Sequence, residues 1–290
     1  MNTLSRQVYV ALILAVVSAL PPGEAFAQGR FDNVEIVAHH VAGSFYYLAG
    51  QGGNIGVSVG EDGIVMIDDQ FAPLTDKIVA AIRGISDAEI RFLINTHVHG
   101  DHTGGNENMG RMGVLILARD EVRIRLEAQS PKDALPVLTY SDAITLHLNG
   151  SEVHAAPLPP GHTDGDSYIH FRDEDVIHVG DVFRTVAFPV IDRNNGGTLP
   201  GTIDALAILA GLGGPNTKYV PGHGEVSTRA DVIEFRDMVM TVAKRVASLV
   251  DDGASYEQVV AASPTREFEA KWGDPGRFLT AVYAELAGMD

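Results

Sequence analysis

The first third of the chain alternates short apolar runs with clusters of glycine and acidic residues. This pattern predicts β-strands, because a strand needs only about four to eight apolar or alternating residues between turn signals. Glycine-rich turns at 50–53 and 61–63 separate the runs. Apolar residues at helical spacing then predict a helix over Leu74–Ile85. The predicted strands of this part are Val34–Val37, Phe45–Ala49, Ile55–Val59 and Ile64–Ile67.

Strands followed by helices occur a second time along the chain. Two successive β-then-α halves with no linker between them favour an α/β sandwich in a single domain, with two sheets inside and helices outside. A doubly wound nucleotide-binding fold is disfavoured, because no Gly-x-Gly-x-x-Gly segment follows the first strands. The remaining predicted strands are Arg91–Asn95, Val114–Ala118, Ile144–Leu148, Glu152–Ala155, Ser167–Phe171 and Val176–Val179. The remaining predicted helices are Glu121–Ala128, Ile203–Leu212, Asp231–Val250 and Arg277–Leu286.

Composition and charge narrow the class of function. The chain has 290 residues, of which 45% are apolar and 20% are charged, so a packed core is expected. Its formal net charge of -17 repels phosphate backbones and anionic lipid headgroups. We therefore expect no nucleic-acid partner and a small-molecule substrate; no feature of the sequence defines an oligomeric state. Because the chain has no cysteine, a metal must be held by His, Asp or Glu.

The N-terminus has the pattern of a secretory signal peptide. Arg6 precedes an apolar run from Val8 to Leu20, and the small-residue triplet Ala25-Phe26-Ala27 follows. The apolar run is short for a membrane span, so we expect cleavage before Gln28 and no stable membrane anchor afterwards. The sequence thus predicts a signal peptide at 1–27, a mature domain at 28–290 and a periplasmic or secreted protein.

Four potential metal ligands fall within six residues, directly after the predicted strand Arg91–Asn95. In extended backbone the first three side chains share one side, and a turn at the glycine between them brings the fourth beside them. Burying such groups without a partner costs several kcal/mol (on the order of 2–7 per polar group), whereas a metal ion satisfies them together. The four residues are His97, His99, Asp101 and His102.

Three later residues repeat the pattern of a polar side chain beside glycine at a predicted strand end. They are His162 in Gly-His-Thr, Asp181 in Gly-Asp and His223 in Gly-His-Gly. Loops at strand ends are where functional sites are commonly built. The other histidines lie in strand-like segments without a companion motif, so we expect ordinary structural roles for them.

The order of these four motifs resembles that of the metallo-β-lactamase superfamily, from the strand at Ile64 to about Val226. The resemblance implies an αββα four-layer sandwich with the metals at one edge of the two sheets. It implies one metal site of His97, His99 and His162, a second of Asp101, His102 and His223, and Asp181 as a bridge. Asp68 resembles the family's supporting aspartate, which is not itself a ligand.

This ligand set suits hydrolysis by metal-bound hydroxide, because two divalent ions that share a water lower its pKa toward neutrality. Asp101 is the expected catalytic residue, orienting the nucleophile as well as binding metal. Zinc is the expected metal, and the all-N/O ligands also suit iron or manganese. The expected substrate is a small molecule with an amide, ester or thioester carbonyl.

Two features divide the substrate prediction. Predicted export and the cysteine-free ligand set resemble dizinc β-lactamases and make β-lactam hydrolysis the leading hypothesis. An aspartate at position 181 is instead similar to glyoxalase II and lactonases, so a lactonase or thioesterase is the alternative. Another class is an oxidoreductase in which one iron oxidises a persulfide, and a third is a metal-dependent binding protein without turnover.

Arg193, in the loop 189–197, is the predicted contact for a substrate carboxylate. The segment Gly50–Asn54 is either a lip over the site or a plain turn.

Overall fold

The computed structural model describes residues 29–289, and the described residues from 34 onward form one compact unit. The predicted signal peptide at 1–27 lies outside the described residues, so its cleavage stays a prediction. None of the helices in the described part combines the length and the apolar character needed to cross a membrane.

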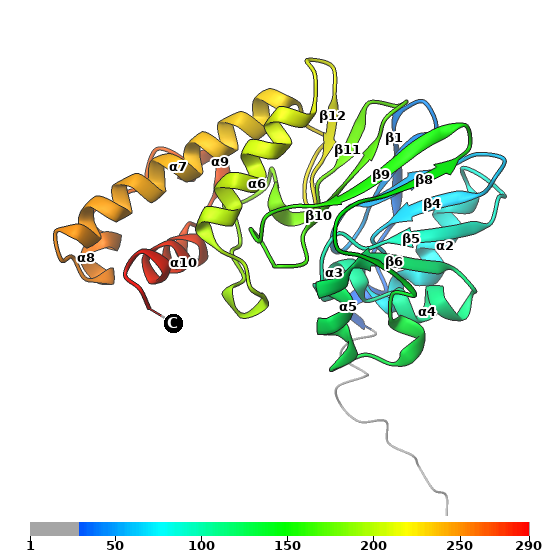
Figure 1. The fold of residues 1–290 in the computed structure, drawn as a ribbon, viewed down its shortest axis with the longest axis horizontal. Helices are drawn as coiled ribbons and strands as arrows, with labels where there is room; N and C mark the ends of the chain where they lie inside the picture. The colour runs from blue at the N-terminus through cyan, green and yellow to red at the C-terminus, as the bar shows by residue number, and fades with distance from the viewer. Residues whose placement is uncertain (1–28, 290) are drawn as a thin grey trace, which may run out of the picture. The chain divides into compact units, whose positions relative to one another are not determined.

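The first half of this unit builds a seven-stranded sheet whose strands follow their order in the chain (Figure 1). Neighbours from β1 to β4 are antiparallel, and neighbours from β4 to β7 are parallel. Parallel neighbours need a crossover, which α2 (Thr75–Arg83), α4 (Asn106–Arg111) with the short α3 (Gly100–Thr103), and α5 (Asp120–Glu127) supply. The strands are β1 (Val37–Ala42), β2 (Phe45–Ala49), β3 (Ile55–Ser58), β4 (Ile64–Ile67), β5 (Ile90–Ile94), β6 (Leu115–Arg119) and β7 (Leu138–Tyr140).

The second half builds a five-stranded sheet in the order β12-β11-β10-β9-β8. Strands β8 to β11 form an antiparallel meander, whereas β12 is parallel to β11 and is reached through α6 (Leu199–Leu212). The strands are β8 (Ile144–Leu148), β9 (Ser151–Pro157), β10 (Ser167–Phe171), β11 (Val176–His178) and β12 (Lys218–Val220). The helices that follow are α7 (Arg229–Asp251), α8 (Tyr256–Ala261), α9 (Glu269–Trp272) and α10 (Gly276–Leu286).

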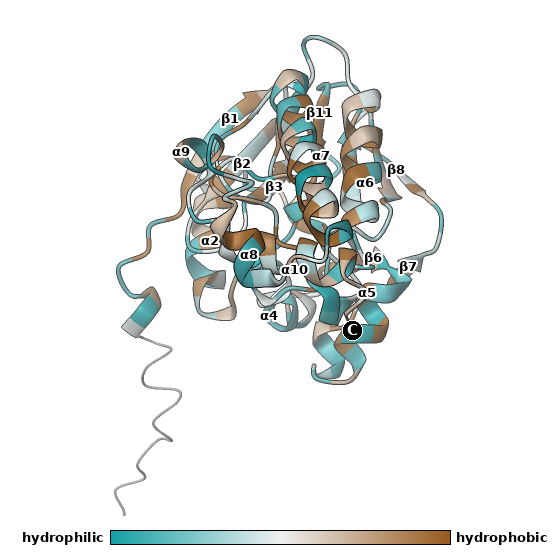
Figure 2. Cartoon of the chain, turned by 90° about the vertical axis from the view of Figure 1, so that its left-hand side faces the viewer, coloured by the Kyte–Doolittle hydropathy of each residue, from teal (hydrophilic) through white to brown (hydrophobic). Residues whose placement is uncertain are grey.

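Apolar side chains on both faces of each sheet produce four layers. Between the sheets, Phe45 of β2 and Phe171 of β10 are fully buried, and their ring centroids lie 4.5 Å apart. On the outer face of the second sheet, Tyr168 packs into a cluster with α6, α7 and α10. On the outer face of the first sheet, Ala118 packs against α5. Apolar and polar positions alternate along α7 in Figure 2, as one-sided burial requires. The expected αββα sandwich is therefore confirmed.

The differences from the predicted elements lie where the apolar pattern is weak. The predicted strand Val34–Val37 is wrong, because β1 runs over Val37–Ala42. Most of β1 is exposed at the edge of the sheet, and its position is set by pairing with β2 rather than by burial. The strands β7 and β12 have only three residues each, and the periodicity does not reveal them. The short helices α3, α4, α8 and α9 likewise escape prediction from the pattern.

Candidate metal centre

The strands of both sheets deliver the candidate ligands to one edge of the sandwich. Asp68 directly follows β4, and the segment that begins at Asn95 follows the parallel strand β5. In the second sheet, Asp181 follows β11 and His223 follows the parallel strand β12. His162 lies in the loop after β9, which runs in the same direction as β11 because β10 is antiparallel to both. Parallel strands end at the same sheet edge, so residues distant in sequence converge there.

The backbone of the His97–His102 segment differs from the extended path that the sequence suggested. His99 is extended, with φ -66° and ψ 147°, but the helix α3 begins at Gly100. The N–H groups of His102 and Thr103 both donate to the carbonyl of His99 at 3.0 Å. The prediction that Asp101 shares an extended side with His97 and His99 is therefore wrong. A helical turn, with Asp101 in its favourable first turn, brings Asp101 and His102 to the cluster.

All seven predicted ligands fall into three overlapping groups. In each group, one potential ligand atom per residue lies within 4.8 Å of the others. The groups share members, since His97 belongs to two of them and His102 to two. They are His97, His99 and His162; His97, His102 and Asp181; and Asp101, His102 and His223. The structure thus brings together every residue that the sequence singled out as a ligand.

Asp68 fixes the orientation of two of these imidazoles from outside the cluster. Its carboxylate is fully buried and accepts hydrogen bonds from the N–H and the hydroxyl of Thr96, both at 2.8 Å, and from Nδ1 of His102 at 2.7 Å. Because the Thr96 hydroxyl hydrogen is donated to Asp68, its oxygen accepts from Nδ1 of His97 at 2.9 Å. Both rings therefore carry their proton on Nδ1 and leave Nε2 as a lone pair that faces the cluster.

The other two imidazoles of the first group are held in the same manner. Nε2 of His99 donates to the carboxylate of Asp192 at 2.7 Å, and Nδ1 of His162 donates to the carbonyl of Val190 at 2.6 Å. The inner nitrogens, Nδ1 of His99 and Nε2 of His162, then face each other at 2.8 Å as two acceptors. Two lone pairs at this distance repel each other unless a cation or a proton lies between them.

Two carboxylates make one half of the cluster acidic, namely the half that contains Asp101, His102, Asp181 and His223. Asp181 Oδ2 lies 3.3 Å and Asp101 Oδ2 lies 3.2 Å from Nε2 of His223. Burial alone would raise the pKa of Asp101, but the hydrogen bond from His223 and the charge of His102 lower it to about 2. Burial likewise opposes a charge on His102, yet Asp181 and Asp68 outweigh it and raise the pKa of His102 well above its usual value. This half of the cluster therefore favours positive charge.

The other half of the cluster, which contains His97, His99 and His162, favours neutral imidazoles. Burial, together with the neighbouring imidazoles of His102 and His162, lowers the pKa of His97 well below its usual value. Burial also lowers the pKa of His162 to about 4. These rings are therefore neutral through the physiological range, and neutral imidazole is the form that binds a metal.

Unsatisfied polar atoms show that the cluster fits a cation. Nε2 of His97, Nε2 of His102 and Oδ1 of Asp181 are buried and have no hydrogen-bond partner among the described residues. His102 Nε2 and Asp181 Oδ1 lie 3.2 Å apart, and both are acceptors in the neutral tautomer that Asp68 selects. A proton or a metal ion must therefore lie between them, and the raised pKa of His102 describes uptake of the proton. An unpaired buried polar group costs about 1–3 kcal/mol, and three in one place need a common partner. Divalent metal ions with N and O ligands meet this need.

Two glycines permit the close approach of backbone to this cluster. A Cβ at Gly53 would lie 2.1 Å from Cε1 of His102, and one at Gly222 would lie 1.9 Å from Oδ1 of Asp181. Gly53 belongs to the turn 50–54, whose N–H at 53 donates to the carbonyl of Asp101 and whose N–H at 54 donates to the carbonyl of Gly222. This turn is therefore packed against both halves of the centre, which supports the lip interpretation of the segment.

The sequence did not identify the residues that surround the ligands. Asp192 is one of them, although it directly precedes Arg193, the residue that the sequence favours. The guanidinium of Arg193 donates to the carbonyl of Met289, and no described hydrogen bond or ion pair joins it to the cluster. Its role as a substrate contact stays a prediction. Arg184 lies three residues after Asp181 in the sequence, and the N–H of its neighbour Thr185 donates to the carbonyl of His223.

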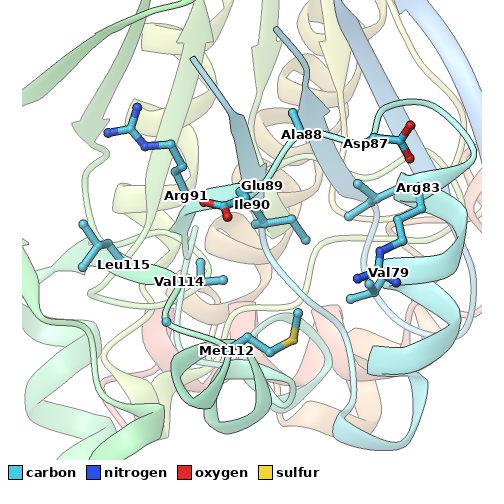
Figure 3. Close-up of a pocket in the computed structure, with 12 residues that line it drawn as sticks. Val79, Arg83, Asp87, Ala88, Glu89, Ile90, Arg91, Met112, Val114 and Leu115 are labelled. Carbon is cyan, nitrogen blue, oxygen red and sulfur yellow. The ribbon is translucent and has the colours of Figure 1, made fainter. Parts of the chain in front are cut away.

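A surface cavity of about 430 Å³ lies at the other edge of the first sheet (Figure 3). It is lined by the first residues of β5 and β6 together with α2, including Val79, Arg83, Ile90 and Leu115. Because the ligands follow the last residues of β5, this cavity is separate from the cluster. It contains none of the seven candidate ligands, so the geometry of the cluster, and not cavity size, locates the functional site.

Comparison with known proteins agrees with this geometry. The family model of the metallo-beta-lactamase superfamily matches residues 48–223, more than half of the chain, so the chain belongs to this superfamily. Among solved structures, it is similar to a metallo-beta-lactamase from Pontibacter korlensis (16% identity, TM-score 0.62, covering 71% of this chain and 99% of that one). It is also similar to the DIM-1 metallo-beta-lactamase (16% identity, TM-score 0.63, covering 72% of this chain and 99% of that one).

A third similar structure is the sec-alkylsulfatase Pisa1 from Pseudomonas sp. (15% identity, TM-score 0.71, covering 86% of this chain and 50% of that one). This chain therefore spans half the length of that enzyme. At these identities the likeness establishes the fold and not the substrate.

The hydrogen bonds of Asp68 generate a prediction about metal affinity. We expect Asp68→Asn to weaken zinc binding about 10- to 100-fold, because the NH2 group of the amide must replace one acceptor oxygen and would face a donor of Thr96 or His102. Competition with a chromophoric chelator measures this change.

Asp69→Asn is the matched control. Asp69 is also fully buried, and burial beside Asp68 raises its pKa well above the usual value, so an amide resembles its neutral form. We expect the zinc affinity of this variant to lie within about threefold of wild type. A change of this size is what a substitution without a specific role produces. Equal losses in the two variants would contradict the role assigned to Asp68.

Proposed function

We propose that the protein is a hydrolase that uses two divalent metal ions, zinc in the first instance, to open a carbonyl bond in a small molecule. The observation that carries this proposal is the overlap of the three ligand groups through His97 and His102. Seven ligands with shared members exceed the three or four that one zinc ion takes from a protein. The superfamily membership of the chain supports hydrolysis as the class of reaction.

Two divalent ions held by these residues would supply the activation of a water, whose pKa falls to about 7 on such ions, and the polarisation of a substrate carbonyl. The chain contributes position and charge. His97, His99 and His162 present lone pairs fixed by outer hydrogen bonds to one subsite, and His102, fixed by Asp68, lies with His223 at the other. The side chain of Asp101 is 30% exposed and ionised, so its carboxylate can accept a hydrogen bond from a water and orient it for attack.

β-Lactams are the leading substrate class. Two of the similar structures are metallo-beta-lactamases, and substrates of this class carry a carboxylate that a cation near the metals would bind. We assign this role to Arg184. Its Nε is buried without a hydrogen-bond partner among the described residues, and the N–H of the next residue, Thr185, donates to the carbonyl of His223. The backbone that carries Arg184 is therefore bound directly to the site.

A lactone or thioester is the second candidate, favoured by the carboxylate of Asp181 at the junction of the two halves. The alternative of a mononuclear iron oxidoreductase needs only part of the ligand set, and the number of bound ions separates it from hydrolysis. A sulfate ester belongs in the same substrate panel because of the alkylsulfatase neighbour. Export to the periplasm or the exterior is part of the proposal and rests on the N-terminal sequence alone.

Metal stoichiometry is the first test. Elemental analysis should find close to two divalent ions per chain, and chelation should abolish a turnover that zinc restores. We expect Asp181→Ala to weaken one of the two ions and to lower turnover by orders of magnitude, because a ligand shared by both halves is lost. The fold should remain, as measured by circular dichroism. The matched control is Asp173→Ala, an exposed aspartate two residues after β10. One tightly bound ion that saturates activity would refute the two-metal proposal.

Substrate choice is the second test. In a panel of cephalosporin, lactone, thioester and sulfate ester, we expect the cephalosporin to be hydrolysed fastest. Arg184→Ala should lower kcat/KM for substrates with a carboxylate about 10- to 100-fold, since a charge-assisted hydrogen bond contributes about 1.5–3 kcal/mol. Neutral lactones should be unaffected. Arg193→Ala in the same assay tests the residue that the sequence favours, and a larger effect there would reverse the assignment.

The mature N-terminus is the third test. Intact-mass spectrometry of protein from the periplasm of a Gram-negative host should give a chain that starts at Gln28, because the residues before it fit a signal peptidase site. A product that retains residues 1–27 would mean that the segment is a permanent anchor.

A further inference from the structure

One surface loop supplies the outer hydrogen bonds of two candidate ligands. This loop, Phe188–Thr198, joins the Asp181 turn to α6. Its residue Asp192 accepts from Nε2 of His99 at 2.7 Å, and the carbonyl of Val190 accepts from Nδ1 of His162 at 2.6 Å. The two imidazoles that the loop holds belong to the same ligand group, whereas Asp68 and Thr96 hold His97 and His102.

The loop is held in a single shape by its own hydrogen bonds. The N–H of Asp192 donates to the carbonyl of His162 at 2.9 Å, and the N–H of Gly197 donates to the carbonyl of Asp192 at 2.9 Å. The amide of Asn195 donates to the Asp192 carboxylate at 2.7 Å. Arg125 of α5 donates to the Asn195 side chain at 3.0 Å. Asp192 is thus oriented before it meets His99.

The last helix of the chain supports this loop from the other side. The rings of Phe188 and Phe278 of α10 are stacked, with centroids 5.7 Å apart and an interplanar angle of 15°. The N–H of Leu199, the first residue of α6 directly after the loop, donates to Glu285 of α10 at 2.7 Å. Arg193 donates to the carbonyl of Met289, just after α10. These contacts come from residues beyond 223, where the match to the family model ends.

We propose that Asp192 is a positioning residue for the His97, His99 and His162 subsite, and that α10 sets its position through the Phe188–Thr198 loop. Loss of the Asp192 carboxylate frees the His99 ring to rotate or to move its proton to the inner nitrogen, which blocks that ligand. A shift of α10 acts on the same subsite by moving the loop. The subsite of Asp101, His102 and His223 has no described hydrogen bond to this loop, so it should not respond. This inference rests on the proposed metal centre.

The test measures the two zinc dissociation constants separately in the full-length mature protein, by competition with a chromophoric chelator. We expect Asp192→Ala to weaken one zinc ion about 10- to 100-fold and to leave the other within about threefold. Asp192→Asn keeps an acceptor for His99 and should recover most of the affinity. In cobalt-substituted protein, one exchangeable imidazole N–H resonance should be lost in Asp192→Ala and return in Asp192→Asn.

The role of α10 is tested with a pair of matched substitutions. We expect Phe278→Leu to weaken the same ion about three- to tenfold, an effect within the range of substitutions that act through a packed element. Phe268→Leu is the control, because Phe268 contacts Trp272 in the same aromatic cluster, with centroids 5.9 Å apart, and has no described ring contact with the loop. If Phe278→Leu does not fold, Glu285→Ala removes the hydrogen bond from α10 to Leu199, the residue that directly follows the loop.

Each outcome decides between the proposals. Equal weakening of both ions by Asp192→Ala, or no weakening, would overturn the role of Asp192. Identical zinc affinities in Phe278→Leu and Phe268→Leu, at similar melting temperatures, would overturn the role of α10. Wild-type protein that binds two zinc ions but hydrolyses no substrate in the panel would remove the proposed hydrolysis alone. Wild-type protein that binds no zinc would remove both proposals.

Discussion

The buried carboxylate of Asp68 is the interaction on which the rest of the site depends. It has no exposure to solvent, and a charge there is tolerable only with hydrogen bonds to each oxygen, which Thr96 and His102 provide. Asp68 also adopts a φ of +59°, a left-handed conformation that directs the chain away from the end of β4. The same bonds fix the proton positions of His97 and His102. The residue at the end of β4 thus orients the candidate ligands that follow β5.

The two sheets must keep their relative position for these side chains to meet. Backbone hydrogen bonds between the two sheets hold that position. The N–H of Ser167 in β10 donates to the carbonyl of Thr96 at 2.9 Å, and the N–H of Asn54 donates to the carbonyl of Gly222 at 2.7 Å. The amide of Asn54 also donates to the carbonyls of Pro221 and Gly224. A displacement of either sheet would break these bonds before it separated the ligands. The packed core behind them resists such a displacement, because Phe45 and Phe171 interlock the two sheets.

The sequence predicts elements with a clear apolar pattern and polar residues that would be costly to bury without a partner. It does not predict contacts that arise only when distant segments meet in the fold. The strands Ile64–Ile67 and Ser167–Phe171 have their predicted bounds, because short apolar or alternating runs between turn residues are typical of buried strands. The exposed edge strand β1 differs from its prediction for the opposite reason. The ligands stand out because imidazoles beside apolar strands need a partner. Asp192 and Val190 do not stand out, since the first is 93 residues from His99 and the second acts through its main chain, which carries no sequence signal.

The candidate ligands are therefore oriented from two different parts of the chain. His97 and His102 are oriented by Asp68 and Thr96, at the strand ends of the first sheet. His99 and His162 are oriented by a loop that α10 supports. The electrostatic character divides in a related way, because burial keeps His97 and His162 neutral while Asp68 and Asp181 favour positive charge at His102. Two ions bound as proposed, one at neutral imidazoles and one beside carboxylates, would therefore differ in affinity and in sensitivity to protons. Substitutions in α10 would then act on His99 and His162 through the loop and leave the strand-end hydrogen bonds to His97 and His102 in place.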